Sequence, residues 1–297
     1  MSLNALFRET RPQFLVLSLI LAALGAAVAW YEGRFDLGDA LLASLGLVLA
    51  HASVNVLNDT FDYRSGIDLR TRRTPFSGGS GLLPTGQLRP SQALALGVGC
   101  LVLAGAIGAW FVLVAGGWLL PLLLVAACLI VFYSPVILKG PWPEWSAGVG
   151  LGALPVLGMY FVQTGTYTWT ALIASVPSFF LVHNLLLLNE FPDAEADAFG
   201  KRRTLPVTIG KDRSAVVYAT AALAVYAWIV AWSVAGVMPA WTLLALLTLP
   251  LAIRAIQAAR HHGDRERLVR GMAVNVQLTL ATQGLLAVGY LVAGLLR

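Results

Sequence analysis

Nine runs of mostly apolar residues follow one another along this chain of 297 residues. A helix needs about 20 apolar residues to cross a hydrocarbon core about 30 Å thick. Backbone polar groups inside a bilayer must be paired within the protein, so such runs fold as helices. We therefore expect an all-α membrane protein, a bundle of about nine transmembrane helices within one domain (residues 1–297), over 13–30, 38–57, 92–115, 117–138, 146–163, 169–188, 214–235, 237–259 and 272–295.

The basic residues lie on one side of these expected helices. Of the 20 Lys and Arg residues, only Arg34 and Arg297 fall on the other side when Arg254 is counted with its nearer helix end. Cytoplasmic loops are enriched in Lys and Arg. We therefore expect the N-terminus in the cytoplasm, the C-terminus outside, and the protein in the cytoplasmic (inner) membrane. The net charge of +5 then reflects topology and contact with the lipid bilayer, and not nucleic-acid binding.

An acidic pattern, NVLNDTFDYRSGID, follows the second apolar run at residues 55–68. If the helix continues through it at about 100° per residue, one face collects oxygen and nitrogen ligands. That face carries Asn55, Asn58, Asp59 and Asp62, with His51 one turn earlier. Gly66 is expected to end the helix, which allows Asp68 to fold back toward the same face.

A second acidic pattern, NEFPDAEADAFGKRRT, follows the sixth apolar run at residues 189–204. Asn189, Asp193 and Asp197 recur every four residues and share one helix face. Glu195 points away from that face and is expected to be solvated. Pro192 is expected to kink the helix or to begin a new one. Both patterns lie on the same, cytoplasmic, side of the expected bundle.

Two facing sets of carboxylates repel each other unless a cation lies between them. Aspartate oxygens suit Mg²⁺, which completes its shell with water and substrate phosphates, and Arg and Lys bind phosphate. Such basic residues follow each pattern: Arg70, Arg72 and Arg73, then Lys201, Arg202 and Arg203. Charged loops are common in membrane proteins, but two related patterns favour a site for a diphosphate head group with a long hydrocarbon tail.

The two patterns resemble the signatures of the UbiA superfamily of intramembrane prenyltransferases. Asn58-Asp59-Thr60-Phe61-Asp62 resembles its NDxxD motif, and Asp193 with Asp197 resembles its DxxxD motif. Nine helices with both motifs on the cytoplasmic side match this superfamily as well. The resemblance implies an enzyme that uses Mg²⁺ to ionise a polyprenyl diphosphate, after which an electron-rich aromatic acceptor attacks the allylic cation.

Within the superfamily the chain looks most like the MenA branch, the 1,4-dihydroxy-2-naphthoate prenyltransferases of menaquinone biosynthesis. Three segments carry this likeness: the D-x-x-x-G-x-D form over 62–68, GKRRTLPVTIG (200–210) and LGALPVLGMYFVQTG (151–165). The likeness implies 1,4-dihydroxy-2-naphthoate as the acceptor, which also loses its carboxylate in the overall reaction. The branch often has N-N-x-R-D where this chain has NEFPD, so an arginine of that pattern is missing here.

The resemblance also implies roles for individual residues. Expected metal-binding residues are Asn58, Asp59, Asp62, Asp193 and Asp197. Expected catalytic residues are Asp68, as a base or a supporting group, with Asn55 and Tyr133. Expected substrate-binding residues are Arg72 and Lys201 first, then Arg202, Lys139, Asn189 and Asn275. Asn275 lies on a polar face of the last helix, where hydrogen bonding between helices is an equal alternative.

The loop TPFSGGSGLLPTG (74–86) is rich in glycine and serine. Its position directly after the first acidic pattern favours a lid over the site, with a simple connector as the alternative.

Other functions remain open at this stage. A UbiA-type enzyme could use 4-hydroxybenzoate, homogentisate, a phosphosugar or a lipid glycerol as acceptor, or could cyclise a terpene with no acceptor. An ion-coupled secondary transporter could also use membrane-embedded acids. Transporter sites lie near the bilayer midplane at broken helices, whereas these acids lie at one end of the bundle.

Overall fold

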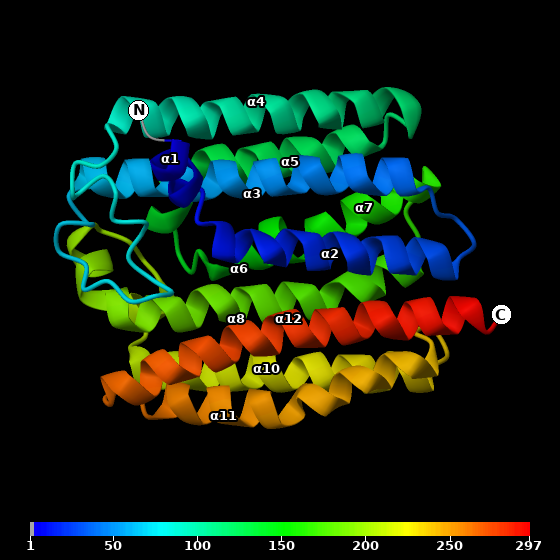
Figure 1. Cartoon of the computed structure of the whole chain (residues 1–297). Coiled ribbons are helices and arrows are strands. Elements are labelled where there is room, and N and C mark those ends of the chain that lie inside the picture. The colour runs from blue at the N-terminus through cyan, green and yellow to red at the C-terminus, as the bar shows by residue number, and fades with distance from the viewer. Residues whose placement is uncertain (1–2) are drawn as a thin grey trace.

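The computed structural model describes residues 3–297, and every regular element in that range is helical (Figure 1). The expected all-α fold is therefore confirmed. The elements are α1 (Leu3–Glu9), α2 (Pro12–Tyr31), α3 (Leu37–Ser65), α4 (Pro90–Val114), α5 (Leu119–Phe132), η1 (Ile137–Lys139), α6 (Glu144–Gly148), η2 (Val149–Ala153), α7 (Leu154–Thr164), α8 (Trp169–Phe199), α9 (Leu205–Thr208), α10 (Lys211–Val234), η3 (Ala240–Thr248), α11 (Leu249–Arg260) and α12 (Arg265–Leu295).

Eight helical segments of residues 3–297 are long and apolar enough to span a membrane. Two of them join shorter elements: α6, η2 and α7 form one span, and η3 with α11 forms another. The expected span 117–138 is wrong in its length, because α5 has only 14 residues. A helix of that length rises about 21 Å. Pro135 lacks a backbone N–H and disfavours helix in the preceding residue, which explains this early end.

Helices α3 and α8 extend well beyond the expected spans and carry both acidic patterns on regular helix. As expected, α3 ends at Gly66, which has a left-handed φ of 79°. Of the two expectations for Pro192, the start of a new helix is wrong, because α8 continues through both Pro177 and Pro192 to Phe199. The i, i+4, i+8 spacing of the second pattern is therefore preserved.

The main hydrophobic core lies among α2, α7, α8, α10, η3, α11 and α12. A second core cluster joins α2 and α7 to α3, α4 and α5. The N-terminal helix α1 and the last turn of α12 lie at opposite ends of the bundle (Figure 1). This placement agrees with an odd number of crossings, of which α5 is the short one.

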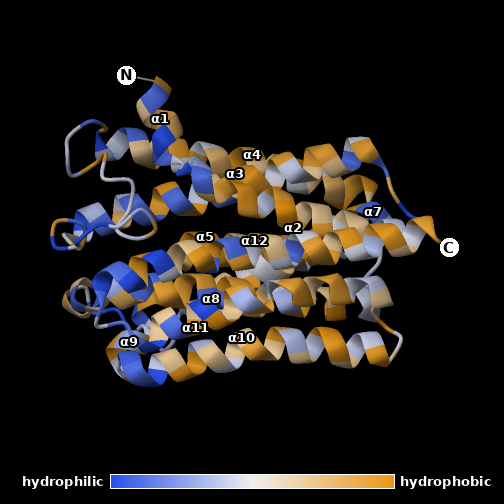
Figure 2. Ribbon diagram, turned by 60° about the horizontal axis from the view of Figure 1, so that its bottom comes forward, coloured by the Kyte–Doolittle hydropathy of each residue, from blue (hydrophilic) through white to orange (hydrophobic). Residues whose placement is uncertain are grey.

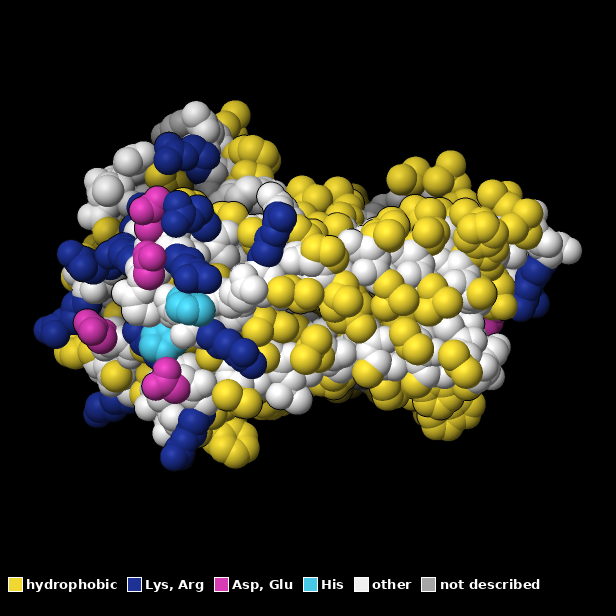
Figure 3. Space-filling model, turned by 90° about the horizontal axis from the view of Figure 1, so that it is seen from below, with side chains coloured by type: hydrophobic (Ala, Val, Ile, Leu, Met, Phe, Trp, Pro, Cys, Tyr) yellow, Lys and Arg dark blue, Asp and Glu magenta, His cyan; other side chains and the backbone are white. Residues whose placement is uncertain are grey.

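Polar and charged residues concentrate at one end of the bundle (Figure 2). In the view of Figure 3, Lys, Arg, Asp and Glu side chains gather at that end, and hydrophobic side chains cover most of the remaining surface. Many large apolar side chains of α4 and α5 are exposed, such as Leu113 and Leu124. Such a surface fits contact with lipid. We refer to the end formed by α1, the loop over 66–89 and the turn over 200–204 as the charged end.

Asn275 lies inside the bundle, where its amide joins three helices. Its Oδ1 accepts a hydrogen bond from the Tyr218 hydroxyl at 2.8 Å, and its Nδ2 donates to the Asn184 carbonyl at 3.1 Å. The Asn184 amide in turn donates to the Tyr218 carbonyl at 2.9 Å. Of the two alternatives given for Asn275, the structure therefore favours hydrogen bonding between helices.

Close packing of η2 on α8 depends on Gly152. A Cβ atom added there would lie 2.6 Å from the Ser178 carbonyl oxygen and 2.9 Å from its carbon. We expect Gly152→Ala to lower the thermal unfolding midpoint in detergent by several degrees, because overpacking costs about 1–3 kcal/mol. The matched control is Gly99→Ala on the exposed face of α4, where the added atom meets nothing within 4 Å. An equal shift in both variants would contradict this assignment.

Candidate active site

The two acidic patterns meet at the charged end through a single arginine. Nη1 of Arg202 lies 3.0 Å from Oδ1 of Asp197, and its Nη2 pairs with Oδ1 of Asp62. Asp62 belongs to α3 and Asp197 to α8, so this guanidinium links two helices that are far apart in sequence. We had expected Arg202 to bind substrate, but in this structure it pairs with carboxylates of both motifs.

The segment between α1 and α2 contributes a second guanidinium, that of Arg11, which lies near Asp59. Nη1 of Arg11 lies 3.9 Å from Oδ1 of Asp59, whose side chain is only 2% exposed. Arg11 has a left-handed φ of 56°, which is uncommon for a residue other than glycine. The turn before α2 thus directs a second guanidinium to the acidic motifs.

The loop over 66–89 covers both motifs. The Ser80 backbone N–H donates to Oδ2 of Asp59 at 2.6 Å, and the Ser77 hydroxyl donates to Oδ1 of Asp193 at 3.2 Å. The Arg73 guanidinium fastens the loop internally by donating to the carbonyls of Gly78, Gly79 and Ser80. This contact with both motifs is the placement that the lid hypothesis requires.

Gly79 lets the loop approach the first motif closely. A Cβ atom at this position would lie 3.2 Å from the Asp59 carboxylate, and its φ is 70°. Both the space and the backbone conformation favour glycine here.

Asp68 folds back toward the first motif, as expected, and its backbone N–H donates to the Asp62 carbonyl at 3.4 Å. Burial, followed by the nearby charges of Asp62 and Asp59, raises the pKa of the Asp68 carboxyl to about 8. A carboxyl group in this state can hold a proton near neutral pH, which is a property of acid–base residues.

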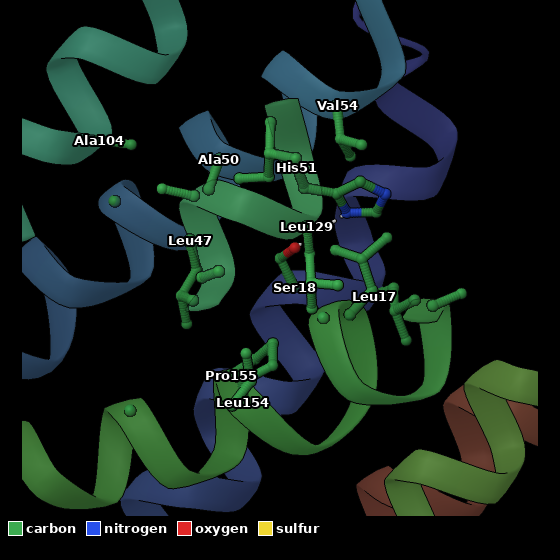
Figure 4. Close-up of a pocket in the computed structure, with 18 of the residues that line it drawn as sticks. Leu17, Ser18, Leu47, Ala50, His51, Val54, Ala104, Leu129, Leu154 and Pro155 are labelled. Carbon is green, nitrogen blue, oxygen red and sulfur yellow. Dashed lines mark hydrogen bonds between the residues drawn. The ribbon is translucent and has the colours of Figure 1, made fainter. Parts of the chain in front are cut away.

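A cavity of about 500 Å³ opens beneath the motifs and continues into the apolar bundle. Its polar rim includes Arg11, Asn55, Asn58, Tyr133 and Asn189. Below the rim, its walls are mainly aliphatic side chains of α2, α3, α4, α5, α7 and α8, some of which Figure 4 shows. It extends along α5 from Tyr133 to Leu119, a distance of about 20 Å at the helical rise.

Two asparagines of the first motif are anchored by neighbouring segments. Nδ2 of Asn58 donates to the Ser134 hydroxyl at 3.0 Å, and Nδ2 of Asn55 donates to the Thr10 carbonyl at 3.1 Å. These bonds leave the amide oxygens of Asn55 and Asn58 for other partners. Nearby, the buried Oδ1 of Asn189 has no hydrogen-bond partner within residues 3–297.

Three of the expected substrate-binding residues lie on the surface of the protein. Arg72, Lys139 and Lys201 are exposed to solvent at the charged end. Glu195 is exposed, as predicted. The guanidiniums that reach the motif carboxylates are instead those of Arg11 and Arg202.

Sequence reasoning missed four buried or partly buried residues near the motifs. Arg11 was counted only as a topology charge. Glu9, Glu144 and Glu190 are buried, and Oε1 of Glu144 accepts from the Leu205 backbone N–H at 2.5 Å. Glu190 adjoins Asn189, and this position inside the second pattern was the only signal for any of the three acids.

The residues present fit Mg²⁺. Their ligand atoms are hard oxygens, and the buried Oδ1 of Asp59 lacks a hydrogen-bond partner among the described residues. Across residues 3–297, no three acidic, histidine or cysteine side chains converge into a ready-made metal cage. Mg²⁺ commonly binds through one or two carboxylates, water and substrate phosphates. Asp59 and Asp62 on α3, with Asp193 and Asp197 on α8, offer carboxylates of this kind.

Comparison with known sequences identifies the family. The sequence profile of the UbiA prenyltransferase family matches residues 18–292. The chain belongs to the UbiA prenyltransferase family. It is 24% identical to a 1,4-dihydroxy-2-naphthoate octaprenyltransferase of Bacillus subtilis over 97% of this chain and 92% of the relative. It is also 30% identical to a digeranylgeranylglyceryl phosphate synthase of Thermococcus kodakarensis over 75% of each chain. The family resemblance noted from the motifs is therefore confirmed.

Solved structures of UbiA homologues share the fold. A UbiA homologue from Aeropyrum pernix K1 has a TM-score of 0.74 at 18% identity, over 94% of this chain and 98% of that one. A homologue from Archaeoglobus fulgidus, bound to DMAPP and Mg²⁺, has a TM-score of 0.60 at 16% identity, over 98% of each chain. These UbiA proteins extend the likeness over nearly the whole chain.

Glu9 ties α1 to the covering loop and provides a pH-dependent contact. Its Oε2 accepts from the Ser80 hydroxyl at 2.6 Å, and burial raises the pKa of its carboxyl to about 7. Because folding raises this pKa, the protonated form of Glu9 stabilises the folded protein. That contribution to the free energy of unfolding is lost as pH rises through about 7. We expect the wild-type protein to lose about 2–3 kcal/mol of stability between pH 5 and 8 from this group, and Glu9→Gln to remove that loss.

Thermal midpoints measured at four pH values between 5 and 8 would show the difference. Glu266→Gln is the matched control, because the Glu266 side chain is 79% exposed. A wild-type pH profile that Glu9→Gln leaves unchanged would contradict the buried state of this carboxyl.

Proposed function

We propose that this UbiA-family chain transfers a polyprenyl group from polyprenyl diphosphate to 1,4-dihydroxy-2-naphthoate in a Mg²⁺-dependent reaction. One observation carries the proposal: two acidic motifs with two guanidiniums lie at the mouth of a long apolar cavity. A ligand with a diphosphate head and a hydrocarbon tail matches both halves of this site.

The diphosphate binds at the charged end in this proposal. Asp59, Asp62, Asp193 and Asp197, with Asn58, would hold Mg²⁺, which neutralises charge on the leaving group. Arg202 would contribute donors to the diphosphate oxygens, and Arg11 would do so from the opposite side. The relative from Archaeoglobus fulgidus, solved with DMAPP and Mg²⁺, supports this assignment by analogy.

The prenyl tail occupies the apolar cavity. Aliphatic walls favour a hydrocarbon chain, and they keep water away from the carbon that becomes cationic when diphosphate leaves. The loop over 66–89 would act as the lid, because Ser77 and Ser80 already bond to Asp193 and Asp59.

The acceptor ring approaches from the polar rim of the cavity. Asn55 and Tyr133 line this rim, where they would orient the acceptor beside the allylic carbon. Asp68 is the proposed base or supporting group, in keeping with its raised pKa. The near-full-length likeness to the naphthoate enzyme of Bacillus subtilis favours 1,4-dihydroxy-2-naphthoate over other acceptors.

We place the charged end in the cytoplasm, in line with the positive-inside rule, and the bundle in the cytoplasmic membrane. A transporter fits less well. The acids cluster at one end of α3 and α8, and both helices are continuous through their spans. Midplane sites at broken helices are typical of secondary transporters.

Substitution of one proposed metal ligand in each motif tests the proposed reaction. We expect Asp62→Ala and Asp193→Ala each to lower Mg²⁺-dependent prenyl transfer by at least about a hundredfold, since electrostatic stabilisation of a leaving group is worth several kcal/mol. Purified variants would be assayed with labelled prenyl diphosphate, and size-exclusion profiles would confirm that they remain folded.

The matched control is Glu195→Ala, because Glu195 lies two residues from Asp193 on the same helix but is exposed. It should retain wild-type turnover. Full activity in both aspartate variants would refute the proposed site.

A panel of acceptors tests the substrate assignment. The wild-type protein would be incubated with labelled prenyl diphosphate and 1,4-dihydroxy-2-naphthoate, 4-hydroxybenzoate, homogentisate or a glycerol phosphate lipid. We expect a prenylated product with the naphthoate, identified by mass. Prenylated 4-hydroxybenzoate or prenylated lipid, with no naphthoate product, would overturn the choice of acceptor and keep the enzyme class. Product formed without any acceptor would indicate a cyclase.

A further inference from the structure

A buried pair of polar side chains lies on the mainly apolar wall of the cavity. The Ser18 hydroxyl on α2 and Nδ1 of His51 on α3 are 2.9 Å apart. The two residues are only 1% and 3% exposed, and both line the cavity. Figure 4 shows them facing each other among Leu17, Leu47 and Leu129.

The other ring nitrogen of His51 has no partner. Among residues 3–297, no group forms a hydrogen bond with Nε2, while Nδ1 is engaged by Ser18. Nε2 is not among the buried side-chain atoms that lack a hydrogen-bond partner, so it is accessible from the cavity that His51 lines. A ring nitrogen that is open to a cavity and has no partner among the described residues can bond to a polar ligand there.

The position of His51 along α3 shows where Nε2 lies relative to the proposed diphosphate site. His51 precedes Asn55 by one turn and Asp59 by two turns on the same helix face, so it lies about 6 Å and about 12 Å below them along the axis. The diphosphate belongs at the level of Asp59. A group that bonds His51 therefore lies deeper than the diphosphate, next to the first carbons of the prenyl chain.

The two proposed substrates differ in what they offer at this depth. A prenyl tail consists of hydrocarbon and cannot bond to an imidazole. An aromatic acceptor carries hydroxyl groups on its ring. When Nδ1–H of a neutral imidazole donates to Ser18, Nε2 is an acceptor and can receive a hydrogen bond from a ring hydroxyl.

We propose that His51, oriented by Ser18, binds a hydroxyl group of the aromatic acceptor through Nε2 and so selects and positions that substrate. This inference rests on the proposed function. The hydrogen bond fixes the ring beside the allylic carbon. It also increases electron density on the ring, which favours attack on the cation. His51 is thus a substrate-contacting residue, and Ser18 is a positioning residue that acts through it.

The kinetic constants of both substrates separate this role from a structural one. With purified protein, MgCl₂ and farnesyl diphosphate, we expect His51→Leu to raise the KM for 1,4-dihydroxy-2-naphthoate by about tenfold or more, the usual effect of an unmade hydrogen bond. The KM for farnesyl diphosphate should not change. His51→Gln should raise the acceptor KM less than His51→Leu does, because the glutamine amide can still bond to a hydroxyl.

Ser18→Ala provides a second variant that preserves the imidazole and should raise the acceptor KM by a smaller factor. The matched control is Ser53→Ala. Ser53 is buried on the same helix as His51, but its hydroxyl donates to the Gly97 carbonyl at 2.8 Å and does not line the cavity. Both KM values should stay at the wild-type level in this control.

The two monomethyl ethers of the acceptor provide the sharpest measurement. Wild-type protein should use one ether about tenfold less well than the parent compound, because that ether lacks the hydroxyl that bonds to His51. His51→Leu should remove this preference, and the affected ether identifies the hydroxyl. If another acceptor is used in the panel above, its hydroxyl and methyl ether serve in the same way.

Three outcomes would overturn the inference. In the first, His51→Leu raises the KM of both substrates alike. In the second, it leaves both KM values unchanged. In the third, the variant prefers the parent compound over the ethers as strongly as the wild type does. In each case wild-type turnover shows that the proposed function still stands. Absence of turnover by the wild-type protein with every acceptor would refute the proposed function and this inference together.

Discussion

The pairing of Arg202 with Asp62 and Asp197 is the interaction on which the site depends. Carboxylates at the end of a membrane bundle lie in surroundings of low dielectric, where unpaired charge is costly. One guanidinium between α3 and α8 lets both acidic motifs approach the same point. Arg11 contributes a second positive charge near Asp59. The remaining carboxyl groups of the two motifs, including that of Asp193, offer hard oxygen ligands that suit a divalent cation.

The cavity separates two kinds of chemistry by depth. Its rim carries guanidinium, amide and phenol groups, whereas its walls are mainly apolar. This division allows a diphosphate to remain near water while the carbon that loses it is shielded. His51 and Ser18 form a hydrogen-bonded polar pair below the rim. The pair links α2 to α3, and its second ring nitrogen is left for a polar ligand such as the aromatic acceptor.

Most of the fold followed from local properties of the sequence. Apolar runs predicted the spans, and 100° periodicity predicted that Asn55, Asn58, Asp59 and Asp62 share a face. The errors occurred where packing or a distant partner decided the outcome. The helix α8 continues through Pro192. The early end of α5 is different, because it has a local cause in Pro135. Asn275 satisfies its amide within the bundle, which no periodicity could distinguish from a substrate contact.

The sequence by itself determined the membrane-spanning bundle, the two acidic helix faces and the family, because hydrophobic length, helical period and motif spacing are local quantities. Only the tertiary structure decided which charges meet. Arg202 and Arg11 reach the carboxylates, while Arg72, Lys139 and Lys201 remain exposed. It also decided the course of the cavity and the pairing of His51 with Ser18, 33 residues away. Such contacts depend on how separate helices pack, to within a hydrogen-bond length, and no single stretch of the chain encodes that distance.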